Sequence, residues 1–306
     1  MDNLAPIALF VYNRPGHTRW TIEALQKNIL ASDSDLIIFS DGPKDAAGSK
    51  QSVLAVRAYL KTIQGFKSVK IMEREKNQGL AKSIIAGVTS VVGEFGKVII
   101  LEDDMVSSQY FLQYMNEALG LYEKEDDVIS IHGYIYPVKG ILPETFFLKG
   151  ADCWGWATWK RGWDLFEPDG KKLLRELKER NLTKEFDFSG SYPYTKMLKD
   201  QIAGRNNSWA IRWYASAFLK NKLTLYPGKS LIYNTGFDGS GTHCGSDNGL
   251  SWNSEVGDAK IEVKKIDAIE SLKPRSMVID FFEMQNNFFI KGFKYLKIIL
   301  KYVFRN

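Results

Sequence analysis

The chain has 306 residues, 44% of them hydrophobic and 25% charged, which suffices for a full core in one large domain or two closely packed ones. Its two cysteines, Cys153 and Cys244, lie far apart, which argues against a disulfide framework or a zinc cluster and favours a reducing cytoplasm. The opening residues lack the pattern of a signal peptide, and no stretch approaches the roughly 20 apolar residues of a membrane-spanning helix.

The net charge of +5 comes from the last part of the chain. Residues 284–306 carry five bases and no acid, so the other 283 residues hold 36 of the 41 bases against all 36 acids. A neutral body argues against nucleic-acid binding. On a helix over 288–306 the five bases fall within an arc of about 120°. Two predictions stay open for this helix: peripheral contact with an anionic membrane, or packing on the protein or a second copy.

Strand-like apolar runs alternate with segments of helical periodicity through the first 134 residues. The expected strands are residues 7–13, 35–40, 68–75, 97–101 and 128–134. The expected helices are residues 19–30, 52–63, 80–95 and 108–123. Such alternation predicts an α/β fold with a mostly parallel sheet flanked by helices.

The second half of the chain has a different composition. Residues 150–164 hold four of the eight tryptophans, residues 171–180 have helical spacing, and residues 235–249 hold five glycines, as expected of a mobile loop. The expected organisation is an α/β half over 1–134, a second half of the same domain over 135–260, and a C-terminal extension over 261–306.

Three consecutive acids, Glu102, Asp103 and Asp104, directly follow the expected strand 97–101. Adjacent carboxylates repel one another, and a hard cation such as Mg²⁺ or Mn²⁺ relieves the repulsion together with substrate phosphates. Alone, the triplet fits an acidic loop or helix start better than a metal site. Its place after a buried strand shifts the balance, because parallel sheets bind ligands beyond the carboxyl ends of their strands.

Polar residues also follow two other expected strands. Asn13 and Arg14 come after the first strand, and Asp41 comes after the second. Because these strands are expected to be parallel, we expect the polar side chains to meet the three acids at one edge of the sheet.

The order of FVYNRP, FSDGP, NQGLAKS and VIILEDDMVSS resembles the nucleotide-sugar-binding half of GT-A fold glycosyltransferases. Glu-Asp-Asp followed by small residues resembles the branch typified by N-acetylglucosaminyltransferase I, among the family 2-like enzymes. ADCWGWATW and YPGKSLIYNTGFDGSGTHCG resemble later elements of that branch. The likeness covers about residues 5–250 and implies a Rossmann-like GT-A fold with a Trp- and Gly-rich acceptor half.

The resemblance implies that several residues bind a UDP-sugar donor. Arg14 would contact the diphosphate or the base, and Asp41 would accept a hydrogen bond from uracil. Lys82 would lie beside the nucleotide and, with a metal, stabilise the charge that develops on the leaving diphosphate.

The resemblance also divides the acids among three roles. Glu102 would hold hydroxyls of the transferred sugar, Asp103 would approach the ribose, and Asp104 would ligate Mn²⁺ or Mg²⁺. His243 lies in the glycine-rich stretch that would close over the donor, and it is a second candidate for the metal or the diphosphate. The alternative for His243 is a loop histidine that only bonds to backbone.

The catalytic base is less clear. An inverting transferase needs a carboxylate to take the proton of the acceptor hydroxyl. The related branch has an acid pair after a tryptophan, but no acid follows Trp209 here. Asp152, beside aromatic residues, is the first candidate and Asp164 the second, ahead of Asp200 and Asp238. The alternative for Asp152 and Asp164 is an anchor for the backbone of a Trp-rich loop.

The tryptophans of residues 150–164 have two possible roles, an acceptor platform or core packing. We expect Trp154 or Trp156 to touch the acceptor. Trp159 and Trp163 are expected to be structural.

The sequence thus predicts a metal-dependent, inverting hexosyl- or N-acetylhexosaminyltransferase that moves a sugar from UDP to a glycan or lipid-linked acceptor, in the cytoplasm or at the inner membrane face. One alternative is a sugar-phosphate nucleotidyltransferase, although FVYNRPGHT has one glycine where such enzymes have a Gly-rich loop. The other is a non-catalytic carbohydrate-binding protein, which the missing acid favours.

Overall fold

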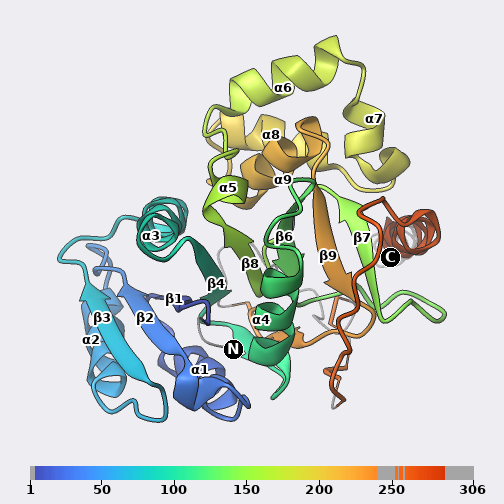
Figure 1. Ribbon diagram of the computed structural model, residues 1–306. Coiled ribbons are helices and arrows are strands. Elements are labelled where there is room, and N and C mark those ends of the chain that lie inside the picture. The colour runs from blue at the N-terminus through green and yellow to red at the C-terminus, as the bar shows by residue number, and fades with distance from the viewer. Residues whose placement is uncertain (1–3, 240–251, 254, 258, 287–306) are drawn as a thin grey trace, which may run out of the picture.

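The computed structural model describes residues 4–239, 252–253, 255–257 and 259–286, arranged as Figure 1 shows. The strands are β1 (Ile7–Val11), β2 (Asp35–Ser40), β3 (Ser68–Glu73), β4 (Lys97–Glu102), β5 (Met105–Ser107), β6 (Val128–His132), β7 (Thr145–Lys149), β8 (Trp156–Trp159), β9 (Leu223–Pro227) and β10 (Ile232–Asn234). The α-helices are α1 (Pro15–Gln26), α2 (Ser49–Leu60), α3 (Leu80–Phe95), α4 (Phe111–Leu121), α5 (Lys160–Trp163), α6 (Gly170–Glu179), α7 (Thr183–Phe186), α8 (Tyr194–Ile202) and α9 (Ala210–Leu219). Residues 272–286 are also helical.

Eight strands form one sheet in the order β3-β2-β1-β4-β8-β6-β9-β7, and β5 pairs with β10 in a small second sheet. All pairings among β1 to β4 are parallel, and so is that of β6 with β9. Strands β7 and β8 run antiparallel to their neighbours. The expected α/β fold with a mostly parallel sheet flanked by helices is confirmed.

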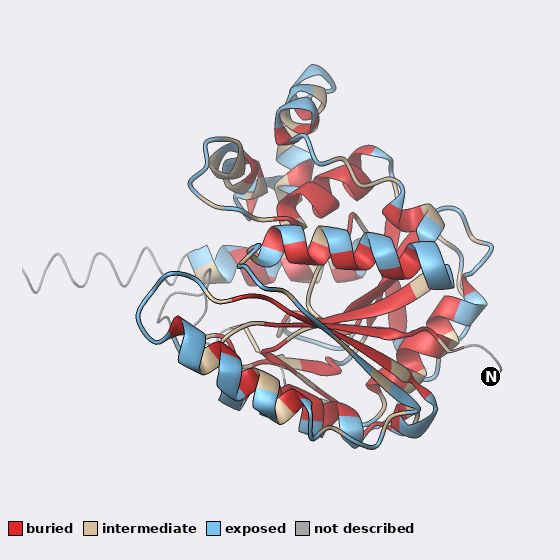
Figure 2. Ribbon diagram, turned by 90° about the vertical axis from the view of Figure 1, so that its left-hand side faces the viewer, coloured by how far each residue is buried: buried red, intermediate tan, exposed pale blue. Residues whose placement is uncertain are grey.

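The central strands are buried on both faces, because helices cover each side of the sheet (Figure 2). Ile7 and Leu9 of β1 pack with α1, α2 and α4. Ala8 and Phe10, which point the other way, pack with α3. This explains why the strands read as continuous apolar runs rather than alternating ones.

Local chemistry sets the helix boundaries. The first helix begins at Pro15, earlier than the expected residue 19, because proline has a helical φ and no N–H to leave unpaired. The helix expected over 80–95 is confirmed at those bounds. It lies between Gly79 and Gly96, whose positive φ angles glycine adopts without strain.

Strand β8 was not expected from the sequence. It lies between β4 and β6, and its direction is opposite to both. The end of β8 that begins at Trp156 therefore lies at the same edge of the sheet as the carboxyl ends of the parallel strands. This brings the loop before Trp156 to the edge where ligands bind.

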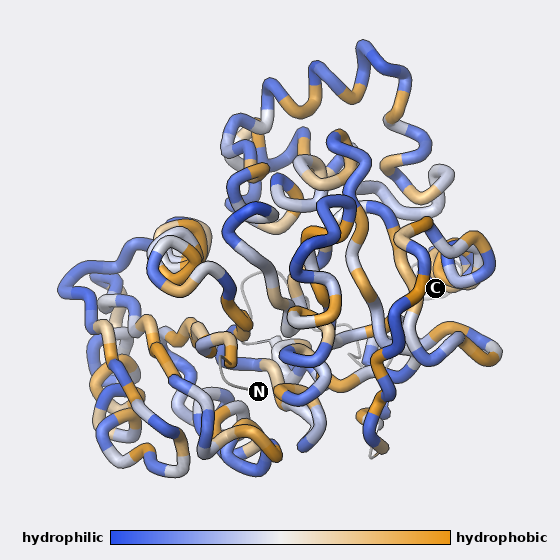
Figure 3. The backbone as a smooth tube through the Cα atoms, in the orientation of Figure 1, coloured by the Kyte–Doolittle hydropathy of each residue, from blue (hydrophilic) through white to orange (hydrophobic). Residues whose placement is uncertain are grey.

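Helices α6, α8 and α9 lie above the second part of the sheet (Figure 1). Asp169 starts α6 by accepting a hydrogen bond from the backbone N–H of Lys171. Hydrophobic and hydrophilic residues alternate along this helix (Figure 3), and Leu173 and Leu177 are buried against the layer below. The helix expected over 171–180 is thus an outer amphipathic helix.

Two predictions concern residues outside the described part of the chain: His243 in the glycine-rich stretch, and the basic helix over 288–306. Their contacts therefore stay predictions. None of the helices in the described ranges is long and apolar enough to cross a membrane.

Candidate active site

The polar residues that follow β1, β2 and β4 line one cavity of about 740 Å³. Strand β1 lies between β2 and β4, and all three point the same way. Arg14, Asp41 and the acids Glu102, Asp103 and Asp104 therefore lie on the cavity wall together, as expected from their places after the strands.

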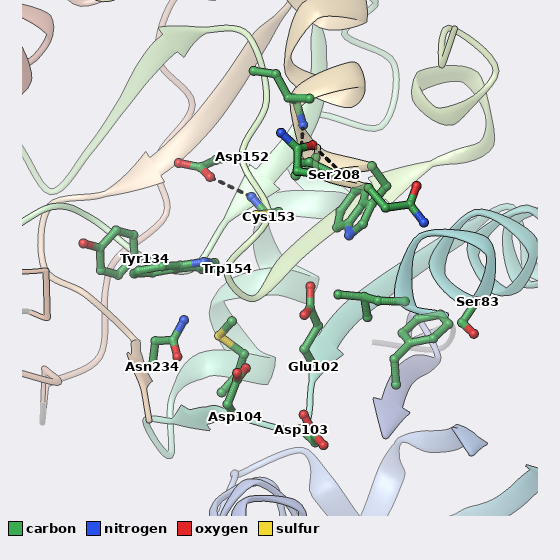
Figure 4. A pocket seen from close by; sticks show the side chains of 18 of the residues that line it. Ser83, Glu102, Asp103, Asp104, Tyr134, Asp152, Cys153, Trp154, Ser208 and Asn234 are labelled. Atoms are coloured by element: carbon green, nitrogen blue, oxygen red, sulfur yellow. Dashed lines mark hydrogen bonds between the residues drawn. The ribbon is translucent and has the colours of Figure 1, made fainter. Parts of the chain in front are cut away.

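The second part of the chain supplies the opposite wall. Because β8 is antiparallel, the loop that precedes it carries Asp152, Cys153 and Trp154 into the same cavity. In Figure 4 Asp152 lies at the far side of the cavity from Asp103 and Asp104. Both halves of the sequence thus contribute to one site.

Arg14 holds the acid pair at one end of the cavity. Its guanidinium contacts Oδ1 of Asp103 and lies 2.9 Å from Oδ2 of Asp104. Asp103 and Asp104 are only 4% and 7% exposed. The other oxygen of each acid, Oδ2 of Asp103 and Oδ1 of Asp104, is buried without a hydrogen-bond partner in the described structure. Two carboxylate oxygens are therefore open to a further donor or cation.

Burial and crowding of like charges perturb this cluster. Burial, followed by repulsion from Asp104 and Asp103, raises the pKa of Glu102 to about 8. Burial also raises the pKa of Asp103, although the charge of Arg14 opposes the rise. Burial disfavours the charge of Arg14, but the two acids keep its pKa above the ordinary value. The cluster thus favours an added positive charge.

We expect Mg²⁺ to raise the melting temperature more at about pH 8.5 than at about pH 6. An acid with a raised folded-state pKa binds more protons in the folded state. Its contribution to stability is therefore present below the unfolded pKa and is lost as pH rises toward about 8 for Glu102. A cation bound beside it competes with that proton and restores the lost stability. Thermal scans with Mg²⁺ or with matched ionic strength measure the difference; an equal shift at both pH values contradicts the prediction.

The residues present fit a hard divalent cation. No group of three or more His, Cys, Asp or Glu suited to a metal occurs among the described residues. Mg²⁺ and Mn²⁺ sites of nucleotide enzymes, however, need only one or two carboxylates, because substrate phosphates complete the ligand set. The open oxygens of Asp103 and Asp104 match this requirement.

Asp41 lines the cavity, but its carboxylate is fully used in anchoring a loop. It accepts hydrogen bonds from the backbone N–H groups of Gly42, Gln78 and Gly79 at 2.9–3.1 Å, and from the side chain of Asn77 at 3.0 Å. These donors fill the lone pairs of a carboxylate, which number about four. The structure therefore leaves no free acceptor for uracil on Asp41, contrary to expectation, and gives it the task of fixing the start of α3.

Lys82 is exposed and does not line the cavity. Its neighbour Ser83 faces inward instead, with a buried hydroxyl that has no partner among the described residues. The other cation on the lining is Lys44, whose Nζ lies 5.7 Å from the ring centroid of Tyr12. That turn of α3 thus directs Lys82 to solvent and Ser83 to the cavity, and a contact of Lys82 with the nucleotide stays a prediction.

Asp152 is the one carboxylate on the wall opposite the acids, among the lining residues that the structure describes. Its Oδ2 accepts a hydrogen bond from the Tyr136 hydroxyl at 2.8 Å, and its Oδ1 accepts from the Cys153 N–H at 2.8 Å. Burial, and then the charge of Asp152, raise the pKa of Tyr136, so its hydroxyl stays protonated and donates. Two donors leave lone pairs on Asp152 free for an acceptor hydroxyl.

The other candidate bases lie outside the cavity. Asp164 is half-exposed and forms an ion pair with Lys160 at 2.6 Å. Asp200 of α8 is paired with Lys196 of the same helix and with Arg205, which follows the helix. None of the lining residues is Asp164, Asp200 or Asp238. The structure therefore contradicts Asp164 as a base, because its ion pair holds it on the surface.

The two tryptophans proposed for the acceptor differ in burial. Trp156 is fully buried and packs with Trp163, Trp209 and Trp213, with ring centroids 5.4–5.8 Å apart. Trp154 is half-buried and lines the cavity. Trp156 is thus a core residue and offers no surface to an acceptor, which corrects that expectation and leaves Trp154.

We expect Trp156→Ala to lower the free energy of unfolding by about 3–5 kcal/mol, because it opens a cavity under β8. Trp154→Ala should cost less stability and weaken acceptor binding instead. Denaturant unfolding together with acceptor titrations of both variants checks this. The prediction fails if Trp154→Ala is the more destabilising change or leaves acceptor affinity unaltered.

Several lining residues were not singled out from the sequence. They include the aromatic residues Tyr134, Tyr136, Tyr192, Tyr194, Tyr226, Phe237 and Trp252. The pattern Tyr-x-Tyr after the strand that ends at His132 was the one available signal, since alternate residues share a face. His132 itself is fully buried, and its Nε2 accepts the N–H of Trp154 at 3.0 Å. It supports the loop that carries Asp152, Cys153 and Trp154 to the cavity.

The start of the glycine-rich stretch lies over Asp104. The backbone N–H of Thr235 donates to the carbonyl oxygen of Asp104 at 2.8 Å. A Cβ on Gly236 would lie 2.4 Å from Asp104 Oδ2, so only glycine fits there. His17 contacts the Thr235 carbonyl and Asp238, at 3.3 and 3.2 Å from its Nε2. His17 thus tethers this stretch to α1.

A comparison with protein-family profiles gives no match, and neither does one with the sequences of curated proteins. Among solved structures, the chain is similar to TarS from S. aureus, with 13% identity and a TM-score of 0.43 over 76% of this chain and 37% of that one. It is also similar to a mannosyltransferase, PcManGT from Pyrobaculum calidifontis in complex with GDP-Man and Mn²⁺, with 12% identity and a TM-score of 0.37 over 71% of this chain and 70% of that one. This chain thus corresponds to little more than a third of the length of the TarS chain. Likenesses at this level leave the function to be argued from the residues of the chain itself.

Proposed function

We propose that the protein is a GT-A fold glycosyltransferase. It moves a sugar from a nucleoside diphosphate sugar, which we propose is a UDP-sugar, to a hydroxyl of a glycan or lipid-linked acceptor. The observation that carries the proposal is the cavity itself. At one end lies the cluster of Glu102, Asp103 and Asp104, which includes two carboxylate oxygens without hydrogen-bond partners in the described structure. At the other end Asp152 lies among aromatic residues. A single cavity of about 740 Å³ has room for a donor and an acceptor together.

In this proposal the chain binds and orients both substrates. Asp104 would hold the metal ion, as the resemblance implies, and the open oxygen of Asp103, which the resemblance assigns to the ribose, would be a second ligand. The ion when bound would act as a Lewis acid toward the leaving diphosphate. Arg14 and Lys44 are cations on the lining of the cavity, and Glu102 at the end of β4 would bind hydroxyls of the transferred sugar. The motif resemblance in the sequence supports the same assignment.

Asp152 is the proposed base, in an inverting reaction. The base takes the proton of the acceptor hydroxyl as the hydroxyl oxygen attacks the anomeric carbon of the donor sugar. The bond from that carbon to the diphosphate breaks at the same time. The Tyr136 hydroxyl and the Cys153 N–H hold the carboxylate in place. Trp154, half-buried beside it, is placed to pack against a sugar ring.

Release of UDP from a panel of UDP-sugars with Mn²⁺ and simple glycoside acceptors tests the proposal. Hydrolysis or transfer with one donor supports it. Metal-dependent UDP binding without turnover of any donor would favour the carbohydrate-binding alternative. Formation of a nucleotide sugar from a sugar phosphate and UTP would favour the nucleotidyltransferase. A location at the cytoplasmic face of a membrane remains a prediction from the sequence of residues 288–306.

A further inference from the structure

Arg14 forms an ion pair that the proposed function does not explain. It follows β1 directly and precedes Pro15, the first residue of α1, so its backbone is fixed at the edge of the sheet. Its guanidinium bridges Asp103 and Asp104, which have no other cation partner among the described residues. Arg14 therefore binds the two acids that the metal ion would need.

A second observation shows that this pairing is incomplete. Oδ2 of Asp103, Oδ1 of Asp104 and Nη1 of Arg14 are all buried without hydrogen-bond partners in the described structure. Buried charged groups normally have all their bonding positions filled, because each unfilled one has lost its water without replacement. The cluster thus has two carboxylate oxygens that can bind a cation and one guanidinium nitrogen that can donate to an anion.

We propose that Arg14 is an internal counter-ion that exchanges partners: when the metal ion binds Asp103 and Asp104, the guanidinium transfers to the diphosphate of the donor. This inference rests on the proposed function. A metal ion and Arg14 are both positive and compete for the same two carboxylates. The diphosphate offers the displaced guanidinium a matching partner, since its oxygens accept the paired N–H groups of arginine.

The exchange makes metal and nucleotide binding cooperative. A metal ion that binds the open oxygens alone competes with Arg14 for the charge of both carboxylates and leaves the guanidinium charge beside the cation. A metal ion that binds with the nucleotide meets a cavity in which Arg14 has a new partner. Each ligand therefore increases the affinity for the other by the same factor.

Arg14→Gln separates the two effects of this residue. Without its internal competitor, the acid pair should bind Mn²⁺ alone about tenfold or more tightly than in the wild type. The same variant should bind UDP in the presence of Mn²⁺ about tenfold or more weakly, because the diphosphate has lost a cation. Arg180→Gln is the matched control, since Arg180, directly after α6, contacts Glu176 at 2.9 Å and the Leu219 carbonyl at 2.8 Å and does not line the cavity.

The experiment measures free Mn²⁺ by electron paramagnetic resonance, and UDP binding by calorimetry, in both variants and the wild type. Circular dichroism checks that each variant is folded. Opposite changes in the two affinities for Arg14→Gln, with Arg180→Gln unchanged, support the exchange. If wild type binds UDP with Mn²⁺ but Arg14→Gln binds Mn²⁺ alone no more tightly, the exchange is wrong and the glycosyltransferase proposal stands. If the wild type binds neither ligand, both are wrong.

Discussion

Asp104→Asn is expected to abolish metal-dependent UDP binding and to lower sugar transfer by at least about 100-fold. Asp104 is 7% exposed, pairs with Arg14 and keeps Oδ1 free of protein partners. An amide of the same shape keeps the packing but has lost the negative charge that a hard cation requires. Calorimetry with UDP and Mn²⁺, together with initial rates, measures both effects.

Asp200→Asn is the control for this change, because Asp200 of α8 forms ion pairs with Lys196 and Arg205 and does not line the cavity. It should bind UDP as the wild type does. Unchanged metal-dependent binding in Asp104→Asn would remove the metal assignment, whereas equal loss in both variants would point to a general loss of folding.

The sequence was sufficient for β1, β2 and β4 because these strands are buried on both faces, whereas β3 at the edge of the sheet is largely exposed. Continuous apolar runs such as residues 97–101 can pack only between two layers, and a polar residue must follow where the strand leaves the sheet. Arg14, Asp41 and the three acids line the same cavity because the strands that precede them are parallel neighbours. The direction of the strands was enough to predict this.

Strand β8 was missed because its four residues, Trp156–Trp159, carry no periodicity that separates a strand from a loop. Its identity as a strand depends on pairing with β4 and β6. These strands end at Glu102 and His132, which are 54 and 24 residues before Trp156, the first residue of β8. The same long-range pairing decides which tryptophans face the core. Trp156 lies in the sheet and is buried, whereas Trp154, two residues earlier, is in the loop that enters the cavity.

Asp41 and Lys82 show a second limit. A motif gives the residue type at a position, but not how many donors the fold brings to it. The backbone of residues 77–79 returns to Asp41 only because β3 pairs beside β2 and the chain then turns back into α3. Helical phase likewise decides that Ser83, not Lys82, faces the cavity. Such facts depend on tertiary packing, which overrides local pattern.

Asp152→Asn is expected to lower kcat by about 10²–10⁴-fold while donor affinity stays within about twofold of wild type. Asp152 is on the opposite wall from the acid cluster, so its charge affects the acceptor step and not the binding of UDP. The amide oxygen still accepts the Tyr136 hydroxyl, which preserves the local hydrogen bond at 2.8 Å. What the variant lacks is a group that can take a proton.

Asp164→Asn provides the matched control. Asp164 belongs to the same Trp-rich segment, residues 150–164, but pairs with Lys160 at the surface. It should transfer sugar at the wild-type rate. Transfer rates, UDP affinity and melting temperature of both variants distinguish a base from a structural residue: a base loses kcat alone, whereas a backbone anchor loses stability and kcat together. Full activity in Asp152→Asn would mean that Asp152 is not the base and that the proton leaves by another route.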